Sequence, residues 1–216
     1  MGPVQSAALA VDPYSAFLNV PYDRGFKDLY LAFIAGISAF GLKPRVTLEI
    51  PGGERRLDRI YDLIRTCRYS FHDLSRVQLE SRPPRTPRFN MPFELGLAVA
   101  WARESGSGTH TWFVFESVNL RMEKSLSDLR GTDCHIHEGR VDGVFRELGN
   151  ALVRSEHAPS VTEMEAIYFD LRRHCGEILK RTGAKTPFEA GVFSRLAVLA
   201  RASAREHIPS LKALGR

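Results

Sequence analysis

The stretch SAFLNVPYDRGFKDLYLAFIAGISAFG, residues 15–41, decides the fold. It opens with a short apolar run that a proline and an aspartate close, which is typical of a buried strand followed by a loop. Apolar residues then recur at helical spacing from Phe26 to Ile37, and Gly41 provides a stop signal for a helix. The stretch therefore predicts a strand, a loop and a helix in this order.

The same alternation continues along the chain. Apolar and β-branched runs predict four further strands, at residues 43–50, 68–74, 109–116 and 132–138. Helical spacing predicts helices between them, at residues 57–67, 90–104 and 141–154. Strands that alternate with helices of this length indicate right-handed crossovers and a parallel sheet covered on both faces. The sequence thus predicts a doubly wound, flavodoxin-like α/β fold with a five-stranded parallel sheet.

Length and composition set the domain organisation. With 216 residues, of which 44% are hydrophobic and 25% charged, the chain can bury one sizeable core. We expect a loose N-terminal segment at 1–14, the α/β domain at 15–154 and a C-terminal helical extension at 155–216. Two amphipathic helices are predicted in the extension, at 161–181 and 187–208, and they fit a lid, a packing arm or an oligomerisation element.

Net charge and cysteine content limit which ligands and which cellular compartment the chain fits. The formal net charge of +5 favours anionic ligands such as nucleotides and falls short of a dedicated nucleic-acid surface. Three widely spaced cysteines suggest neither a disulfide framework nor a metal knuckle, which points to a reducing cytoplasm. No apolar run approaches the roughly 18 residues of a membrane span, and no signal peptide is recognised. We therefore expect a cytoplasmic protein without a membrane anchor.

Ligands of open parallel sheets bind beyond the carboxyl ends of the strands, so binding and catalytic residues are expected in the loops at that edge. These are residues 20–26, 51–56, 72–90 and 116–121. Three prolines and four arginines between residues 75 and 89 predict an irregular loop that borders the crevice. Glu94 follows this loop by about one helical turn, and we expect it to face the crevice.

Glu94 has two interpretations. An acid near the start of a helix complements the helix dipole, which is typically worth about 0.3–1 kcal/mol. Alternatively, the apolar neighbours Phe93, Leu95, Leu97 and Ala98 bury the carboxylate and raise its pKa. A carboxyl group tuned in this way and placed in a cleft is a candidate nucleophile or general acid.

Three segments carry a resemblance to a known family: FLNVPYD (17–23), HDLS (72–75) and above all PRFNMPFELGLAVA (87–100). They resemble the nucleoside 2-deoxyribosyltransferase-like and Toll/interleukin-1-receptor (TIR)-like group of bacterial proteins over residues 15–154. In that group a strand-one loop, an aspartate at the end of strand three and an Asn-x-x-x-Glu-Leu-Gly helix start recur in this order. The resemblance implies N-glycosidic bond cleavage, or ribosyl transfer, on a nucleoside, a nucleotide or NAD. It also implies a role as an effector of bacterial defence.

The resemblance assigns catalytic roles to two acids. Glu94 matches the glutamate that attacks the ribosyl C1′ or stabilises an oxocarbenium-like centre, a chemistry suited to a carboxylate. Asp73 matches an acid that positions a ribose hydroxyl or orients Glu94, and its alternative is an Asx-type cap of the following turn. Bulky Met91, Pro92 and Phe93 stand where the transferases carry small residues, so hydrolysis is favoured over transfer.

Further residues are expected to bind the substrate. Tyr22 is a candidate for stacking on a base or nicotinamide, Asp23 for binding a ribose hydroxyl and Asn90 for a hydrogen bond to Glu94, whereas Phe26 is assigned to the core. Arginines around the crevice are suited to bidentate phosphate binding, and we expect one or two to act, Arg76 and Arg88 first. The set is Arg55, Arg76, Arg82, Arg85 and Arg88.

No metal or cofactor is expected, and NAD enters only as a substrate. The CHIH segment at 134–137 alternates as a strand does and lacks a partner pair at ligand spacing. PGGERR, residues 51–56, lacks the spacing of a phosphate-binding loop.

Two non-enzymatic alternatives stay open: a nucleotide-binding sensor that does not turn over, and an interaction module whose C-terminal helices contact a partner. Convergence of Tyr22, Asp73, Asn90 and Glu94 on one crevice would favour the enzyme. A salt bridge from Glu94 to a structural arginine would favour the alternatives. The resemblance also implies a homo-oligomer, because the family's sites are often completed by a neighbouring subunit.

Overall fold

A computed structural model of the chain describes residues 10–49, 55–77, 83, 85–155 and 157–213. Its strands are β1 (Asp12–Asn19), β2 (Lys43–Arg45), β3 (Cys67–Asp73), β4 (Thr111–Glu116) and β5 (Cys134–Ile136). Its helices are α1 (Lys27–Ala39), α2 (Arg56–Thr66), α3 (Asn90–Glu104), α4 (Arg121–Ser125), α5 (Val141–Ala151), α6 (Val161–Thr182), α7 (Ala190–His207) and α8 (Pro209–Ala213). Short 3-10 turns are η1 (Arg24–Phe26), η2 (Thr47–Glu49) and η3 (Ser127–Leu129).

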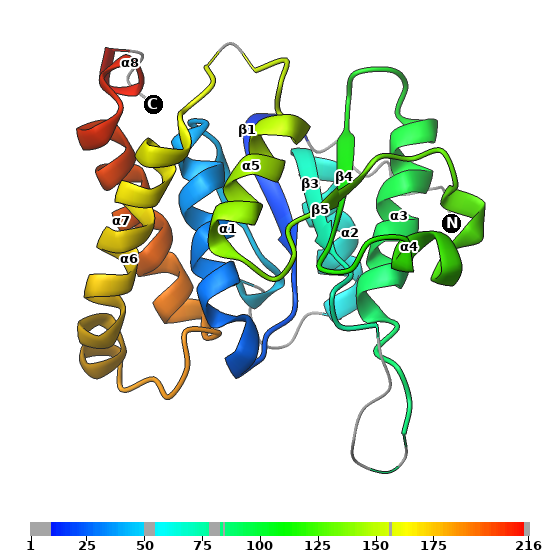
Figure 1. Cartoon of the computed structure of the whole chain (residues 1–216), viewed down its shortest axis with the longest axis horizontal. Coiled ribbons are helices and arrows are strands. Elements are labelled where there is room, and N and C mark those ends of the chain that lie inside the picture. Colours follow the sequence, from blue (N-terminus) through cyan, green and yellow to red (C-terminus); the bar gives the residue numbers. More distant parts are fainter. Residues whose placement is uncertain (1–9, 50–54, 78–82, 84, 156, 214–216) are drawn as a thin grey trace, which may run out of the picture.

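The five strands form one sheet in the order β2-β1-β3-β4-β5, and every neighbouring pair is parallel. Helices α1 and α5 pack together on one face of the sheet, and α2 and α3 pack together on the other (Figure 1). This confirms the predicted doubly wound parallel sheet. The strand order reverses direction between β1 and β3, which is where ligands bind in folds of this topology.

The C-terminal helices form an additional layer. Helices α6 and α7 pack side by side against α1, on the side of α1 that faces away from the sheet (Figure 1). Residues Leu29 to Ala39 of α1 are all buried as a consequence. Ile167 of α6 and Leu196 of α7 belong to the same buried cluster as α1 and the sheet. The extension therefore shares the principal core of the α/β domain.

Local sequence signals delimit α6. Ser160 and Glu163 form a capping box at its start, in which each side chain binds the backbone N–H of the other residue. The helix ends at Gly183, whose φ of 68° lies in the left-handed region that favours glycine. The loop that follows carries Phe188, which packs against the ring of Tyr30 in α1.

Two strand boundaries differ from the sequence-based expectation by three residues or more. β2 ends at Arg45, and residues expected to continue the strand turn into η2, because Glu49 accepts hydrogen bonds from the Val46 amide at 2.9 Å and from Arg45 Nε at 3.0 Å. β1 begins at Asp12 rather than at Ser15. The Asp12 carboxylate accepts from the Tyr14 amide at 3.0 Å and from Lys43 Nζ at 3.1 Å, which anchors the start of the strand.

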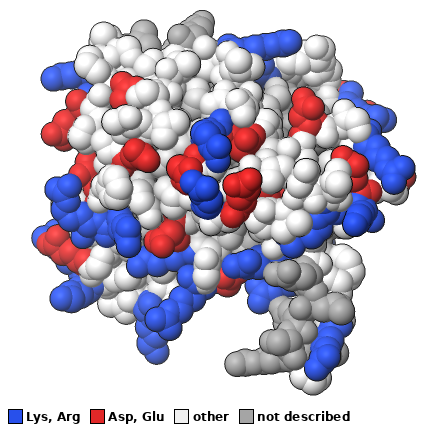
Figure 2. Space-filling view, viewed as in Figure 1, with Lys and Arg blue, Asp and Glu red and all other residues white. Residues whose placement is uncertain are grey.

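Other sequence expectations concern disulfide bonds, membrane-spanning helices and the distribution of surface charge. The three cysteines are free. Across the described ranges, none of the helices combines the length and apolarity that crossing a bilayer requires. On the face seen in Figure 2, Lys and Arg side chains are interspersed with Asp and Glu, as on an ordinary solvated surface.

Candidate functional site

A cavity of about 260 Å³ lies at the carboxyl end of β1, one of the two strands between which the strand order reverses. Its walls come from the β1–α1 loop, η2, the start of α2 and the start of α3. The described lining residues are Asn19, Val20, Tyr22, Thr47, Arg56, Arg88, Asn90, Met91 and Glu94.

Glu94 is buried in the wall of this cavity, with 4% of its surface exposed. Burial raises the pKa of its carboxyl group from 4.5 to about 7, and the positive charge of Arg56 opposes this only in part. Among the residues that the structure describes, no hydrogen-bond or ion-pair partner lies beside the carboxylate. The cavity therefore holds an acid that keeps its proton to a much higher pH than an ordinary glutamate does.

The position of Glu94 in the helix disfavours the dipole interpretation. Helix α3 begins at Asn90 with no acid in its first turn, so Glu94 is the fifth residue of the helix. The effect of the helix dipole falls off within the first turn. A buried acid at this position destabilises the folded state through desolvation by more than the dipole returns.

Tyr22 and Arg56 meet at Thr47, and all three residues line the cavity. The hydroxyl groups of Tyr22 and Thr47 are 3.2 Å apart, and Arg56 donates a hydrogen bond to Thr47 at 3.3 Å. Burial is the main cause that raises the pKa of Tyr22, and the negative charge of Glu94 adds to it. The Tyr22 hydroxyl is accordingly a neutral group that feels the charge of Glu94.

The ring of Tyr22 is packed against other aromatic rings. Its centroid lies 6.2 Å from that of Tyr30 and 5.8 Å from that of Phe188, which belongs to the C-terminal extension. The extension thus supports the wall of the cavity from behind. These contacts occupy ring surface that the expected stacking on a base would use, whereas the hydroxyl stays at the cavity.

Asn19, the last residue of β1, ties the cavity to the start of α3. Its side-chain Nδ2 donates to the carbonyl oxygen of Met91 at 3.2 Å and lies 3.0 Å from Nδ1 of His72. Asn19, Thr47 and Arg56 were not singled out from the sequence. The signals available were an asparagine that closes a buried strand and the placement of residues 51–56 at the crevice, although Arg55 rather than Arg56 was named.

Four predicted site residues come together in the structure. Tyr22, Arg88, Asn90 and Glu94 all line the cavity. Asn90 lies one helical turn before Glu94, but the structure contains no hydrogen bond between these two described side chains. The described part of residues 75–89 is irregular, as expected, and delivers Arg88 to the cavity rim.

Asp23 and Arg76 instead bind each other. Arg76 Nε donates to Asp23 Oδ2 at 2.9 Å, and Asp23 also accepts from the Phe26 amide at 3.1 Å at the start of η1. Neither residue is among the described lining residues of the cavity. Phe26 is fully buried, in agreement with its assignment to the core. Arg55 and Arg85 are exposed, and Arg82 lies outside the described residues.

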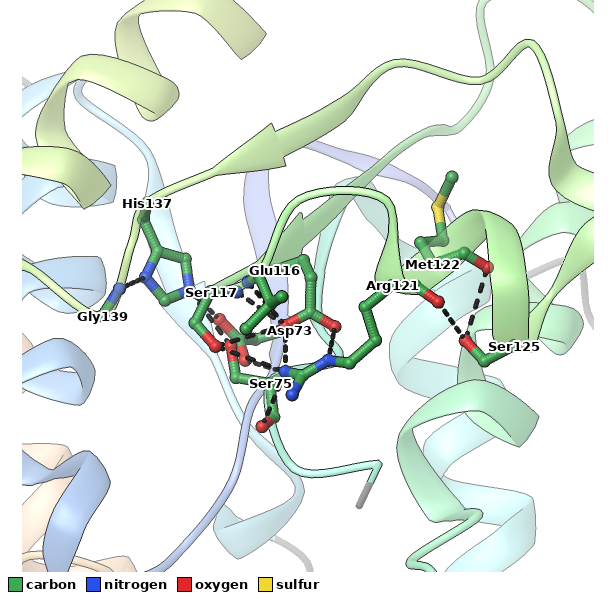
Figure 3. Close-up of polar contacts among 10 residues, drawn as sticks. Asp73, Ser75, Glu116, Ser117, Arg121, Met122, Ser125, His137 and Gly139 are labelled. Carbon is green, nitrogen blue, oxygen red and sulfur yellow. Dashed lines mark hydrogen bonds and ion pairs between the residues drawn. The ribbon is translucent and has the colours of Figure 1, made fainter.

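Asp73 belongs to a separate, buried polar cluster (Figure 3). Its Oδ2 accepts from Nε2 of His137 at 2.9 Å, and its Oδ1 accepts from the backbone amide of Ser75 at 2.9 Å. The second contact has the Asx-type geometry that is the alternative interpretation of Asp73. Asp73 is fully buried and does not appear among the cavity's described lining residues.

Asp73, His137 and Ser75 have the composition of a catalytic triad but not its geometry. Ser75 Oγ and Asp73 Oδ2 both contact the same ring nitrogen, Nε2 of His137, at 3.2 and 2.9 Å. The other nitrogen, Nδ1, accepts from the Gly139 amide at 3.0 Å. A triad needs the serine and the aspartate on opposite nitrogens, so that the imidazole can take the serine proton.

The neighbouring Glu116 completes the cluster as a structural anchor. Its buried carboxylate accepts from the guanidinium of Arg121, and Arg121 also donates to the carbonyl oxygen of Ser75 at 3.0 Å (Figure 3). These bonds join the ends of β3, β4 and β5. We interpret the cluster as a fully paired network that holds the strand ends in register.

Within the described residues no group of His, Cys, Asp and Glu side chains is arranged to hold a metal ion. Comparison with protein-family models, with curated protein sequences and with solved structures finds no match to this chain. The chemistry of the cavity around Glu94 is therefore the observation from which a function is inferred.

Proposed function

We propose that this protein cleaves an N-glycosidic bond, with Glu94 acting on the sugar C1′. The observation that carries the proposal is a buried glutamate without a described partner, in the wall of a cavity at the carboxyl end of β1. A group whose pKa is perturbed by burial inside a cleft is a recognised mark of a functional site. The order of motifs FLNVPYD, HDLS and PRFNMPFELG supports the same assignment.

The charges and the size of the cavity support a nucleotide substrate that is only partly enclosed. Arg56 and Arg88 line it, and guanidinium groups bind phosphates in bidentate fashion. Its volume of about 260 Å³ lies below the range of about 300–1,000 Å³ typical of drug-sized ligands. In this proposal the ribosyl unit enters the cavity and the phosphates remain at its rim, near Arg88.

The number of carboxylates favours NAD⁺ among the substrates considered. Glu94 is the sole carboxylate among the described lining residues, whereas hydrolysis of most glycosides uses a second carboxyl group to protonate the leaving group. Nicotinamide leaves NAD⁺ as a neutral molecule without taking a proton. The ionised Glu94 attacks C1′ or stabilises the cationic sugar as the C1′–N bond breaks. Water then supplies the hydroxyl group of the product, and its remaining proton passes to the solvent.

The test measures release of nicotinamide or nucleobase from NAD⁺, adenosine, 2′-deoxyadenosine and AMP by chromatography. The wild type is expected to release nicotinamide from NAD⁺ fastest. Glu94→Gln keeps the size of the side chain and removes the charge, so kcat/KM should fall by orders of magnitude. Glu104→Gln is the matched control, because Glu104 is exposed at the far end of the same helix.

Undiminished release by a folded Glu94→Gln protein would exclude this function. Equal loss in the Glu104→Gln control would also count against it, because the effect would then not depend on the cavity.

A nucleotide-binding sensor is the second candidate, and one observation favours it. Asp73, the acid that the family resemblance pairs with Glu94, is held by His137 and the Ser75 amide away from the cavity. A protein that binds NAD⁺ without releasing nicotinamide over hours would support the sensor and contradict the hydrolase.

A further inference from the structure

Four buried side chains form a line of hydrogen bonds between the cavity and the opposite end of the sheet. Asn19 Nδ2 lies 3.0 Å from His72 Nδ1, and His72 Nε2 lies 2.9 Å from Ser70 Oγ. Ser70 Oγ in turn lies 2.9 Å from His110 Nε2, and His110 Nδ1 lies 2.8 Å from the carbonyl oxygen of Cys67. All four side chains are at most 5% exposed.

The direction of every hydrogen bond in this line follows from its last acceptor. The Cys67 carbonyl oxygen can only accept, so Nδ1 of His110 carries a proton. Burial is the main cause that lowers the pKa of His110, and burial lowers the pKa of His72 to about 3, so both rings are neutral. Nε2 of His110 therefore accepts, and Ser70 donates its single proton to it.

The same reasoning fixes the remaining two members. Since Ser70 has given its proton to His110, Ser70 accepts from Nε2–H of His72. His72 is neutral, so its Nδ1 accepts from Asn19 Nδ2. The second proton of Nδ2 goes to the Met91 carbonyl oxygen. Both protons of the Asn19 amide are thus committed to the protein, and the side chain cannot reverse without breaking two bonds.

The oxygen of the same amide is left for the cavity. No described residue donates to Asn19 Oδ1. Asn19 Oδ1 is not one of the described side-chain atoms that are both fully enclosed and without a hydrogen-bond partner. This oxygen is therefore accessible to solvent. Asn19 is 3% exposed, and the cavity that it lines is the surface through which that access is possible.

We propose that Asn19 Oδ1 is a fixed hydrogen-bond acceptor that selects ligands carrying a hydroxyl group at the matching position of their ribosyl unit. His72, Ser70 and His110 hold the Asn19 side chain in this orientation. The inference rests on the proposed function only for the ribosyl nature of the ligand. The line ends on a carbonyl group, which has no proton to give, so it orients Asn19 and does not conduct protons.

The orientation is tested first, without ligand, by ¹⁵N NMR of the histidine rings in the full chain. We expect His72 as the Nε2–H tautomer and His110 as the Nδ1–H tautomer, both neutral at pH 7. A His72 ring that carries its proton on Nδ1, or on both nitrogens, would overturn the proposal, because Asn19 would then have to present its NH₂ group to the cavity.

Selection is tested by equilibrium binding of nicotinamide riboside and adenosine, each with its 2′-deoxy and 3′-deoxy analogue, to the Glu94→Gln protein, which prevents turnover. With Asn19 intact, one of the two deoxy forms should bind about 10-fold more weakly than the parent, because it leaves the acceptor unpaired. In an added Asn19→Ala change this difference should disappear. Equal binding of all forms, no binding of either parent, or a difference that survives Asn19→Ala would each refute the proposal.

The positioning role of the line is tested by Ser70→Ala. This change touches no lining residue and frees the His72 ring to change tautomer, so the discrimination against the deoxy form should fall toward unity while the fold is retained. Ser203→Ala is the matched control, because Ser203 is a buried serine bound to Asp170 at 2.7 Å in the C-terminal extension. Discrimination that is unchanged by Ser70→Ala would show that the line only satisfies buried polar groups.

These outcomes are separable from the fate of the proposed function. Deoxy discrimination through Asn19 in a protein that releases no nicotinamide or base would refute the hydrolase and keep this inference. Glu94-dependent release of nicotinamide or base without deoxy discrimination through Asn19 would support the hydrolase and refute this inference.

Discussion

At the scale of single residues, the burial of Glu94 sets the protonation behaviour of the cavity. Its pKa of about 7, against 4.5 for an ordinary glutamate, means that the folded protein holds a proton over a pH range in which the unfolded chain releases it. The stability associated with this proton is fully present below about pH 4.5 and is lost as the pH rises through about 7. Ionisation of Glu94 therefore lowers the unfolding free energy of the protein.

Glu94→Gln is expected to stabilise the protein more at pH 8 than at pH 5. The shift corresponds to roughly 3 kcal/mol of unfolding free energy, since one pKa unit is about 1.4 kcal/mol, and glutamine removes this pH dependence. Urea unfolding of wild type and variant at the two pH values measures the difference. A gain that is the same at both pH values would mean that the pKa of Glu94 is ordinary.

The rate of nicotinamide release gives an independent measure of the same group. If the ionised carboxylate acts at C1′, kcat/KM should rise with pH and level off above about pH 7, in step with the pKa of Glu94 in the free protein. A pH series of initial rates on NAD⁺ tests this. A rate that falls above pH 7 would assign proton donation to Glu94 instead.

At the scale of elements, close approach of backbones fixes the helices on the sheet. A Cβ atom added at Gly143, near the start of α5, would lie 2.2 Å from the carbonyl oxygen of His137. The glycine therefore permits the tight passage from β5 into α5, and this passage holds His137 in the buried cluster with Asp73.

Gly143→Ala is expected to destabilise the protein by about 1–3 kcal/mol, since backbone atoms must move to admit the methyl group. Gly149→Ala is the matched control on the same helix. Apart from its chain neighbours and the backbone of its own helix, no atom lies within 4 Å of its added Cβ, so the better helix propensity of alanine should raise stability by up to about 1 kcal/mol. Chemical denaturation measures the unfolding free energy of both variants. An unfolding free energy of Gly143→Ala equal to that of the wild type would contradict the close packing of this turn.

At the scale of the whole molecule, the C-terminal extension and the α/β domain should unfold together. Ile167 of α6 is fully buried in the core that α1 shares with the sheet. We expect Ile167→Ala to lower the unfolding free energy by about 2–5 kcal/mol. The two tryptophans of the chain, Trp101 on α3 and Trp112 on β4, lie in the opposite face of the sheet.

Tryptophan fluorescence should therefore report the effect of Ile167→Ala with the same midpoint as far-ultraviolet circular dichroism, because both probes follow one cooperative transition. A fluorescence midpoint that stays at the wild-type value while the circular dichroism signal shifts would show that the extension folds independently.

How much could be predicted from the sequence differs between these scales. Periodicity and turn residues were sufficient for the parallel sheet and for the placement of Glu94 at its edge, because both depend on local patterns. The pairing of Asp23 with Arg76, and of Asp73 with His137, joins residues far apart in the chain, so no local pattern reveals it. Asn19 and Arg56 were missed for the same reason, since their importance comes from neighbours that only the fold supplies.

The position of α1 has a consequence for synthesis of the chain. The helices that cover the outer side of α1 are synthesised well after α1 itself, because they begin only at Val161. At about 5–20 residues per second, the stretch between Ala39 and Val161 takes about 6–25 s to be made. Throughout that interval the apolar outer side of α1 lacks the two helices that cover it in the folded protein.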